Sequence, residues 1–403
     1  MITDNTGGLP RYCHPYHGGW DVATIALNIP ESRILFICPV TCARNICLNA
    51  INGGYKDRVD VLALTEDDIV SGSYEEKTVA AACEILDTVQ PRPKAMILFV
   101  SGIDAMLGND HSFQTEEIMS RYPDVTCFVL KMCPITRFSG DLPLVALQHD
   151  MYAPLPEEPV PHTDTVGFIG SNIALHPDNE LIRILQDAGY RPLHIQACDR
   201  YEDYLAIRSA KVNLCLMPFG KTAGELLAER YGAKMIPYFA RPDFASIRTT
   251  ITAVCNALDI ALPDLDAMEA ETVRILQECA AYIGDTELVI DSTATLFPDI
   301  LRKTLTACGF RIRRIYADGV QQKAPDIDAG SIQMPLVRSY EDNENVIAIG
   351  MAASSFAGAD KTVNMFYDNG EWGHYALRML AARIRAAYEH PRSAVQVRKE
   401  ARK

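Results

Sequence analysis

Residues 33–47 read Arg33-Ile34-Leu35-Phe36-Ile37-Cys38-Pro39-Val40-Thr41-Cys42-Ala43-Arg44-Asn45-Ile46-Cys47. The apolar run in this stretch is short and has β-branched residues at its ends, which predicts a buried strand. The three cysteines then fall at the end of that strand and the start of the next helix. In an α/β sheet, ligands and cofactors gather at this edge, and helix N-termini there stabilise thiolates. The stretch therefore predicts a cluster or metal site.

A second group of candidate ligands lies upstream, in residues 12–20, which read Tyr12-Cys13-His14-Pro15-Tyr16-His17-Gly18-Gly19-Trp20. With this group, four cysteines and two histidines fall within 35 residues. Cys38 precedes Cys42 by four residues and Cys47 follows it by five, so a local cluster or metal site is geometrically open. The main chemical alternative is a zinc site built from His14, His17, Cys38 and Cys42. The simplest alternative is that Cys38 and Cys47 are core thiols.

Composition limits the classes of function. At 403 residues the chain is long enough for two or three domains with cores of their own. Its net charge of -14 argues against nucleic acid or an anionic membrane as a partner, although an acidic surface could dock a basic protein. The sequence has neither a transmembrane-length apolar run nor a signal-peptide pattern, so we expect a cytoplasmic protein. Twelve cysteines in such a chain indicate thiols or metal ligands more than disulfides.

Strands and helices are predicted to alternate along almost the whole chain. The pattern predicts strands at 59–64, 95–100, 125–130, 192–197, 212–217, 286–290, 310–316 and 345–350. It predicts helices at 75–89, 111–120, 179–188, 223–231, 298–308 and 375–388, with a loop at 101–110. The proline-dense segment 153–161 predicts a domain boundary. We therefore expect an α/β protein of three Rossmann-like parallel-sheet domains.

The predicted domains are 1–152, which carries the cysteine cluster, 162–284 in the middle, and 285–403 at the C-terminus. The last helix of the third domain could pack back on the first. None of the three contains a convincing nucleotide motif. Phe219-Gly220-Lys221-Thr222 ends like a P-loop, but its first glycine would have to stand at Cys215. The segment 166–172 offers only a Gly-x-x-Gly turn.

The order of these features resembles the nitrogenase component 1 superfamily, which includes dinitrogenase, its assembly scaffolds, protochlorophyllide reductase and the reductase of coenzyme F-430 biosynthesis. Ile37-Cys38-Pro39-Val40-Thr41-Cys42 is similar to the family's His-Gly-Pro-x-Gly-Cys loop. Residues 102–110 resemble the Cys-x-x-x-x-Ile-Gly-Asp-Asp segment, residues 166–232 the middle domain, and residues 369–375 the Gly-x-x-Gly-Tyr element before the last helix. The resemblance spans nearly the whole chain and implies three domains around a central cleft.

The resemblance implies that Cys13 and Cys42 are the first cluster ligands of this chain. A 4Fe-4S cluster needs four thiolates or close substitutes, so two from each of two subunits would complete one at a symmetric interface. Cys38 and Cys47 are reserve ligands. The family's third cysteine is Gly102 here, which has no donor, and the position of the active-site histidine is Phe366. A complex molybdenum–iron cofactor is therefore not expected.

The implied function is an oxidoreductase component of an anaerobe that takes electrons from a separate ATP-dependent reductase of the iron-protein type. The chain itself would bind no nucleotide, and it would work as a homodimer or as a heterodimer or heterotetramer with a related subunit. Candidate catalytic residues are His14, His17, Arg44 and His374. The alternatives are a non-catalytic scaffold for assembling an iron–sulfur cofactor and a zinc-binding structural paralogue.

Overall fold

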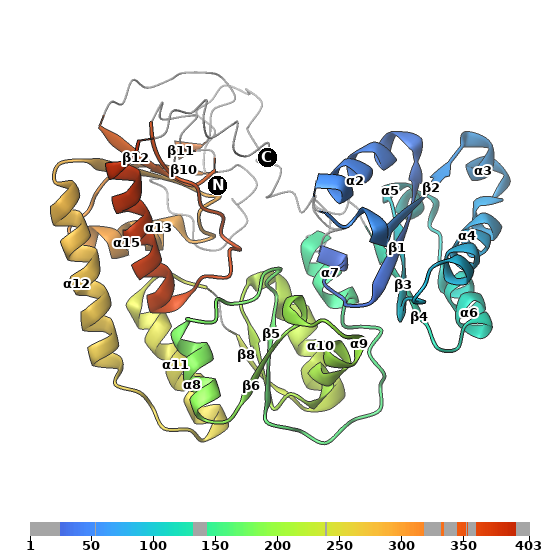
Figure 1. Ribbon diagram of the computed structural model, residues 1–403, viewed down its shortest axis with the longest axis horizontal. Coiled ribbons are helices and arrows are strands. Elements are labelled where there is room, and N and C mark those ends of the chain that lie inside the picture. Colours follow the sequence, from blue (N-terminus) through green and yellow to red (C-terminus); the bar gives the residue numbers. More distant parts are fainter. Residues whose placement is uncertain are drawn as a thin grey trace. The chain divides into compact units, whose positions relative to one another are not determined.

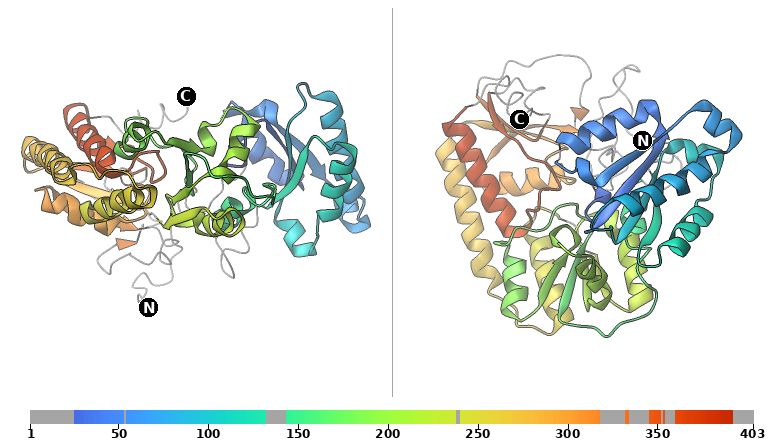
Figure 2. Two further views of the ribbon diagram at one scale, coloured as in Figure 1. Left: turned by 90° about the horizontal axis from the view of Figure 1, so that it is seen from below. Right: turned by 45° about the vertical axis from the view of Figure 1, so that its right-hand side comes forward.

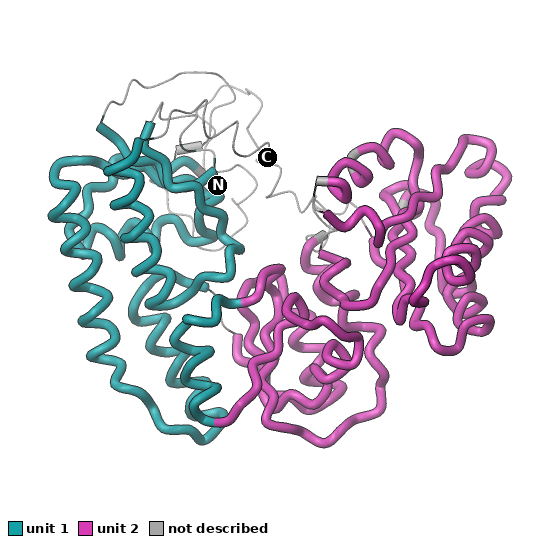
Figure 3. The backbone as a smooth tube through the Cα atoms, in the orientation of Figure 1, with its two compact units in different colours: residues 1–20, 175–188, 240–403 teal, residues 21–174, 189–239 magenta. Residues whose placement is uncertain are grey.

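The computed structural model describes residues 25–52, 54–131, 143–237, 240–317, 332–333, 345–351, 353 and 360–391. The chain divides into two compact units (Figure 3). The N-terminal unit comprises residues 21–174 and 189–239, and the C-terminal unit comprises residues 1–20, 175–188 and 240–403. The described residues form three sheets, and every strand pair within them is parallel (Figure 1). The predicted α/β class with three parallel sheets is confirmed.

The first sheet of the N-terminal unit has the strand order β2-β1-β3-β4. Its strands are β1 (Ser32–Pro39), β2 (Val59–Leu64), β3 (Ala95–Val100) and β4 (Thr126–Lys131). The helices that accompany it are α2 (Val40–Asn52), α3 (Glu66–Ser71), α4 (Tyr74–Thr88), α5 (Gly102–Leu107), α6 (Ser112–Arg121) and α7 (Pro143–Asp150). The loop predicted at 101–110 therefore contains a short helix, α5.

Alternation along β1 divides its side chains between two hydrophobic cores. Ile34, Phe36 and Cys38 belong to one core, and Leu35 and Ile37 belong to the other. A strand that is buried on both faces is typical of a parallel sheet covered by helices on both sides. This explains why the sequence shows an unbroken apolar run here and no polar alternation.

The second sheet of the N-terminal unit has the order β6-β5-β7-β8. Its strands are β5 (Thr165–Ile169), β6 (Arg191–His194), β7 (Val212–Cys215) and β8 (Lys234–Pro237), with α9 (Tyr201–Leu205) and α10 (Lys221–Tyr231). The backbones of Gly170 and Gly220 touch where β5 and β7 end. A Cβ on Gly220 would lie 2.5 Å from the Cα of Gly170. Only two glycines permit this approach.

The sheet of the C-terminal unit has the order β11-β10-β9-β12-β13. Its strands are β9 (Glu287–Asp291), β10 (Arg311–Ala317), β11 (Ile332–Gln333), β12 (Val346–Ile349) and β13 (Lys361–Val363). Its helices are α8 (Glu180–Asp187), α11 (Phe244–Leu258), α12 (Leu265–Ile283), α13 (Pro298–Ala307) and α15 (Gly373–Glu389), of which α11 and α12 were not predicted. α12 and α15 run side by side (Figures 1 and 2).

Helix α8 follows β5 in sequence but belongs to the C-terminal unit. Its first residue, Glu180, is buried and accepts hydrogen bonds from the backbone nitrogens of His374 (2.6 Å) and Tyr375 (3.0 Å) at the start of α15. Asn179 donates to the carbonyl of Trp372 at 3.1 Å. Glu180 thereby satisfies backbone N–H groups that a helix start leaves open, and Asn179 adds a second tie between α8 and the start of α15.

Candidate functional site

The strand order places a topological switch point between β1 and β3 in the first sheet. In open α/β sheets, ligands bind outside the carboxyl ends of the strands at such a point. Ile37 pairs with Val100, so the chain segments that start at Cys38 and Ser101 emerge next to each other. The predicted cysteine site and the Gly102 segment therefore meet at one edge of one sheet.

Cys38 is a core thiol. Its side chain is fully buried. Burial, followed by the charges of Cys42 and Cys47, raises its pKa to about 12. A thiol in apolar surroundings resists ionisation and behaves as a small hydrophobe. Although Cys42 and Cys47 lie near enough to act on it, Cys38 is therefore a poor source of thiolate.

Cys42 and Cys47 lie on different faces of α2. Cys42 is half-buried and packs against the core beneath the helix. Cys47 is exposed. Five residues correspond to about 140° around an α-helix, so these two thiols do not converge on one point. Arg44, a predicted catalytic candidate, is exposed on the same helix.

The described residues of one chain supply part of a ligand set. Among them, no group of three His, Cys, Asp or Glu side chains is arranged to hold a metal ion. Gly102, at the start of α5, has no donor. Cys13, His14 and His17 lie outside the described residues. Cys42 lies near the start of a helix, where a thiolate is stabilised, so it could supply one ligand of a site shared with another chain. It cannot form such a site alone.

Helix α2 also carries an exposed apolar stripe, which the sequence interpretation missed. Val40, Leu48 and Ile51 are 62%, 46% and 59% exposed, and the exposed Cys47 lies among them. Their spacing of eight and then three residues keeps them on one side of the helix. The signal was present, because apolar residues recur at helical spacing while Ile46 and Ala50 already account for the buried face.

His374 is placed in the interior of the C-terminal unit. Its side chain is 2% exposed and its ring stacks with Phe244 at 6.0 Å between centroids. Burial, together with the charges of Arg378 and Arg248, lowers its pKa to about 4. The imidazole is therefore neutral at physiological pH and packs at the start of α15, and it does not line either of the two pockets described below.

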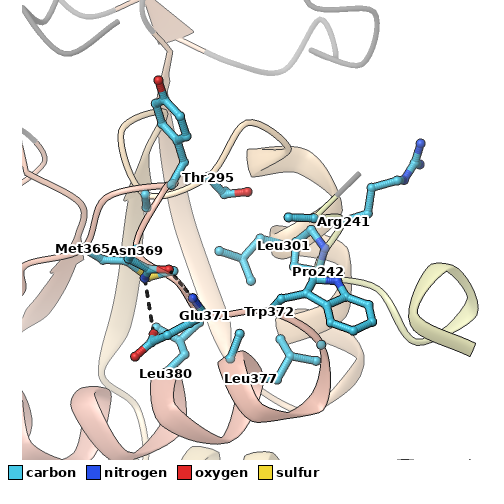
Figure 4. Close-up of a pocket in the computed structure, with 15 residues that line it drawn as sticks. Arg241, Pro242, Thr295, Leu301, Met365, Asn369, Glu371, Trp372, Leu377 and Leu380 are labelled. Atoms are coloured by element: carbon cyan, nitrogen blue, oxygen red, sulfur yellow. Dashed lines mark hydrogen bonds between the residues drawn. The ribbon is translucent and has the colours of Figure 1, made fainter. Parts of the chain in front are cut away.

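A small cavity lies beside the start of α15 in the C-terminal unit (Figure 4). It encloses about 40 Å³. Leu301 and Leu377 line it, and the guanidinium of Arg241 points away from it (Figure 4). A water molecule needs at least about 10–15 Å³, so this cavity has room for a few waters and not for an organic substrate.

A larger, open groove of about 410 Å³ runs between α7 and α10 in the N-terminal unit. Three carboxylates line it, those of Asp150, Glu225 and Glu229. Lys221 Nζ lies 3.7 Å from Glu225 Oε1, but both side chains are largely exposed. Such an exposed ion pair is weak. Nothing in the sequence pattern singled out this groove, because it depends on which two helices pack together.

In the described part of the chain, no helix is both long enough and apolar enough to cross a membrane. No family model matches the sequence, and no curated protein matches it either. Solved structures do match the fold. One described as "Nitrogenase Cp1 at pH 6.5" gives a TM-score of 0.69 at 11% identity, covering 96% of this chain and 95% of that chain. Another, "Nitrogenase Cp1 at pH 5", gives 0.62 at 13% identity, covering 96% and 90%. The chain therefore has a nitrogenase-like fold.

Proposed function

We propose that this chain is a nitrogenase-like oxidoreductase component that shares an iron–sulfur cluster with a partner subunit. The observation that carries the proposal is the likeness of fold, which extends over 96% of this chain and 95% of the nitrogenase structure. A likeness confined to one Rossmann-like domain would carry no such argument, since that architecture hosts many unrelated functions. Here the whole succession of three sheets agrees.

Cys42 is the residue of the described chain that we assign to the cluster, and Cys13 is the second. Cys38 and Cys47 are reserve ligands, because Cys38 is buried in the core and Cys47 is exposed on a different face of α2 from Cys42. A bound cluster would supply one-electron redox chemistry. The chain contributes thiolate sulfur at the switch point, and the core beneath α2 packs against Cys42. We propose that the remaining thiolates come from a second copy or a related subunit.

The exposed stripe on α2 supports a subunit interface at this edge. Large apolar side chains that gather on one helix face mark interaction sites more often than scattered ones do. Val40, Leu48 and Ile51 share the helix of Cys42. A subunit that covers the stripe would also bring its own ligands within reach of Cys42.

We propose that electrons arrive from a separate ATP-hydrolysing reductase. The sequence supports this division of labour, because residues 166–172 offer only a Gly-x-x-Gly turn and Phe219-Gly220-Lys221-Thr222 lacks the first glycine of a P-loop. A cofactor-assembly scaffold and a zinc-binding paralogue are the competing functions.

Anaerobic purification followed by absorption and electron paramagnetic resonance tests the proposal. We expect a reducible iron–sulfur signal in the wild-type protein and its loss in Cys42→Ala. Cys83→Ala is the matched control, because Cys83 is a half-buried thiol on α4, away from this edge. An iron-free protein, or one in which Cys42→Ala keeps the full signal, would contradict the assignment.

Turnover separates the electron-accepting component from a scaffold. With an iron-protein-type reductase and ATP, the component should re-oxidise its cluster when a substrate is added. A scaffold should instead release the cluster to an acceptor protein. Bound zinc in place of iron would favour the structural paralogue.

A further inference from the structure

The open groove between α7 and α10 is lined by one face of each helix. Helix α7 contributes Val145, Ala146, His149 and Asp150. These four lie on one side of α7, because residues three or four apart are neighbours on a helix surface. Leu147, on the other side, is buried in the core of the N-terminal unit. The groove face of α7 is therefore distinct from its packing face.

Helix α10 is divided in the same way. It contributes Thr222, Glu225, Leu226 and Glu229, whose spacing of three, one and three residues belongs to one helix face. Leu227, on the other face, is buried in the same core. The two helices thus pack through one face each, and every carboxylate that they carry lines the groove.

The groove is negatively charged, because its carboxylates outnumber the cations beside them; they are Asp150, Glu225 and Glu229. Lys221 Nζ lies 3.7 Å from Glu225 Oε1 at the surface. Arg230, the residue after Glu229, is turned away, since its Nη1 donates to a backbone carbonyl at 2.7 Å. Glu225 and Glu229 are four residues apart, where like charges destabilise a helix. The stability of α10 therefore does not explain this pair.

The lining of the groove is more than a patch of charge. Val145 and Leu226 are half-buried and add apolar surface to it. His149 adds an imidazole, whose Nδ1 lies 3.0 Å from Asp150 Oδ1. The hydroxyl oxygen of Thr222 is buried and has no hydrogen-bond partner in the described part of the chain. A buried hydroxyl of this kind calls for a partner, and Thr222 belongs to the groove lining.

The carboxylates of the groove do not converge on one point, since no group of three His, Cys, Asp or Glu side chains in the described ranges is arranged to hold a metal ion. A cation whose donors are spread out fits them better. An arginine guanidinium carries five N–H donors in a planar fork, and its methylene stem covers apolar surface. Because the groove is open, an occupant keeps one side exposed, whereas a small-molecule site buries most of its ligand. The groove therefore suits an arginine side chain that a larger body presents.

We infer that the groove between α7 and α10 is the docking site of an arginine-bearing segment of a partner protein. The guanidinium groups pair with the three carboxylates, and one of their N–H groups donates to the Thr222 hydroxyl. The arginine stems cover Val145 and Leu226. The net charge of -14 draws a basic partner toward the chain, and the groove decides where that partner is held. The inference needs no iron–sulfur cluster, so it stands apart from the proposed function.

Fluorescence anisotropy on the full chain tests the groove, with a labelled and capped alanine peptide that carries arginine at every fourth position. We expect saturable binding that weakens as salt is added and that disappears when glutamine replaces the arginines. The double variant Glu225→Gln, Glu229→Gln should bind the peptide about tenfold more weakly. It should fold as the wild-type protein does, because the substitution removes a repulsive pair, and circular dichroism checks this.

The matched control is the double variant Glu84→Gln, Glu116→Gln, which removes the same charge from exposed positions on α4 and α6 of the same unit. It should bind the peptide as the wild-type protein does. Val145→Thr keeps the charge and the shape of the groove but makes its lining more polar, and it should weaken binding about threefold.

Three results would overturn the inference: no binding of the arginine peptide, an equal loss of binding in the control pair, or unchanged binding in Val145→Thr. Spermidine and Mn²⁺ are the competing probes. If either bound more tightly than the peptide and was lost in the groove variant, the groove would belong to a small cation and not to a protein segment. Weak binding of both, insensitive to Glu225→Gln, Glu229→Gln, supports the docking site.

Discussion

The two sheets of the N-terminal unit have the same strand topology, but the residues at the carboxyl ends of their strands differ. Each turns around a switch point, between β1 and β3 in one and between β5 and β7 in the other. At the second, Gly170 and Gly220 bring two backbones into contact. At the first, the half-buried thiol of Cys42 lies near the start of α2. The first edge therefore carries a partly accessible thiol, whereas two backbones are in contact at the second.

The contrast also holds for the cysteines at the two edges. Cys215, at the end of β7, is buried, and its thiol donates to the carbonyl of Met217 at 3.0 Å. Burial raises its pKa to about 12. Cys38 at the end of β1 is buried in the same way, but α2 then adds Cys42 and Cys47 at increasing exposure. The first edge therefore offers thiols across the whole range from core to solvent.

Thiol labelling gives the largest expected effect. Burial raises the pKa of Cys38 to about 12 from an ordinary value of 9.0, so at pH 8 its reactive thiolate is about a thousandfold scarcer than that of an ordinary thiol. We expect iodoacetamide to modify exposed Cys47 first and Cys38 at least about a thousandfold more slowly, with the Cys38 rate rising tenfold per pH unit. Peptide mass spectrometry over time measures both. Equal rates in the folded protein would mean that β1 does not bury Cys38.

Gly220→Ala tests the closed edge. The backbone φ of Gly220 is -87°, which any residue adopts, so the penalty is purely steric. The new Cβ would lie 2.5 Å from the Cα of Gly170, and neither backbone can move away easily. We expect a loss of about 3 kcal/mol in the free energy of unfolding, measured by urea denaturation.

The matched control is Gly232→Ala. Gly232 has a φ of 70°, and its added Cβ would have no atom nearer than 3.9 Å. Backbone strain alone should cost about 1 kcal/mol there. If both variants lost the same free energy, the contact between Gly170 and Gly220 would not be what closes this edge.

The first edge could be foreseen in outline because its signals are local. An apolar run followed by cysteines predicts a strand end whatever the rest of the chain does, and β1 and α2 lie where this pattern places them. The long helices α11 and α12 were missed, although their apolar spacing is present in the sequence. The short helix α5 was taken for a loop, since Gly102 and Gly108 both favour a turn.

What the sequence could not reveal are relations between distant residues. Asp104 falls in the predicted loop 101–110 and His111 at the first position of the predicted helix 111–120, and nothing in the sequence pattern joins their side chains, which form a hydrogen bond in the structure. The Gly170–Gly220 contact needs two strands to be neighbours, which only the strand order determines. His374 was a candidate for a cavity, and its burial depends on Phe244 and Glu180, two residues far away in the chain.

Ile51→Ser gives the smallest expected effect on the chain itself and the sharpest information about the first edge. Ile51 is 59% exposed on α2, whereas Ile46 on the same helix is 4% exposed. Removing the exposed side chain should change the free energy of unfolding by no more than about 0.5 kcal/mol, while Ile46→Ala should cost about 3 kcal/mol.

If the α2 stripe is covered by a second subunit, Ile51→Ser should nevertheless weaken association, as sedimentation measures. Val70→Ser is the control, since Val70 is 88% exposed on α3 and lies outside the stripe. If the wild-type protein, Ile51→Ser and Val70→Ser associated equally, the α2 stripe would not be a subunit interface, and the first edge would lack the interface that a shared cluster requires.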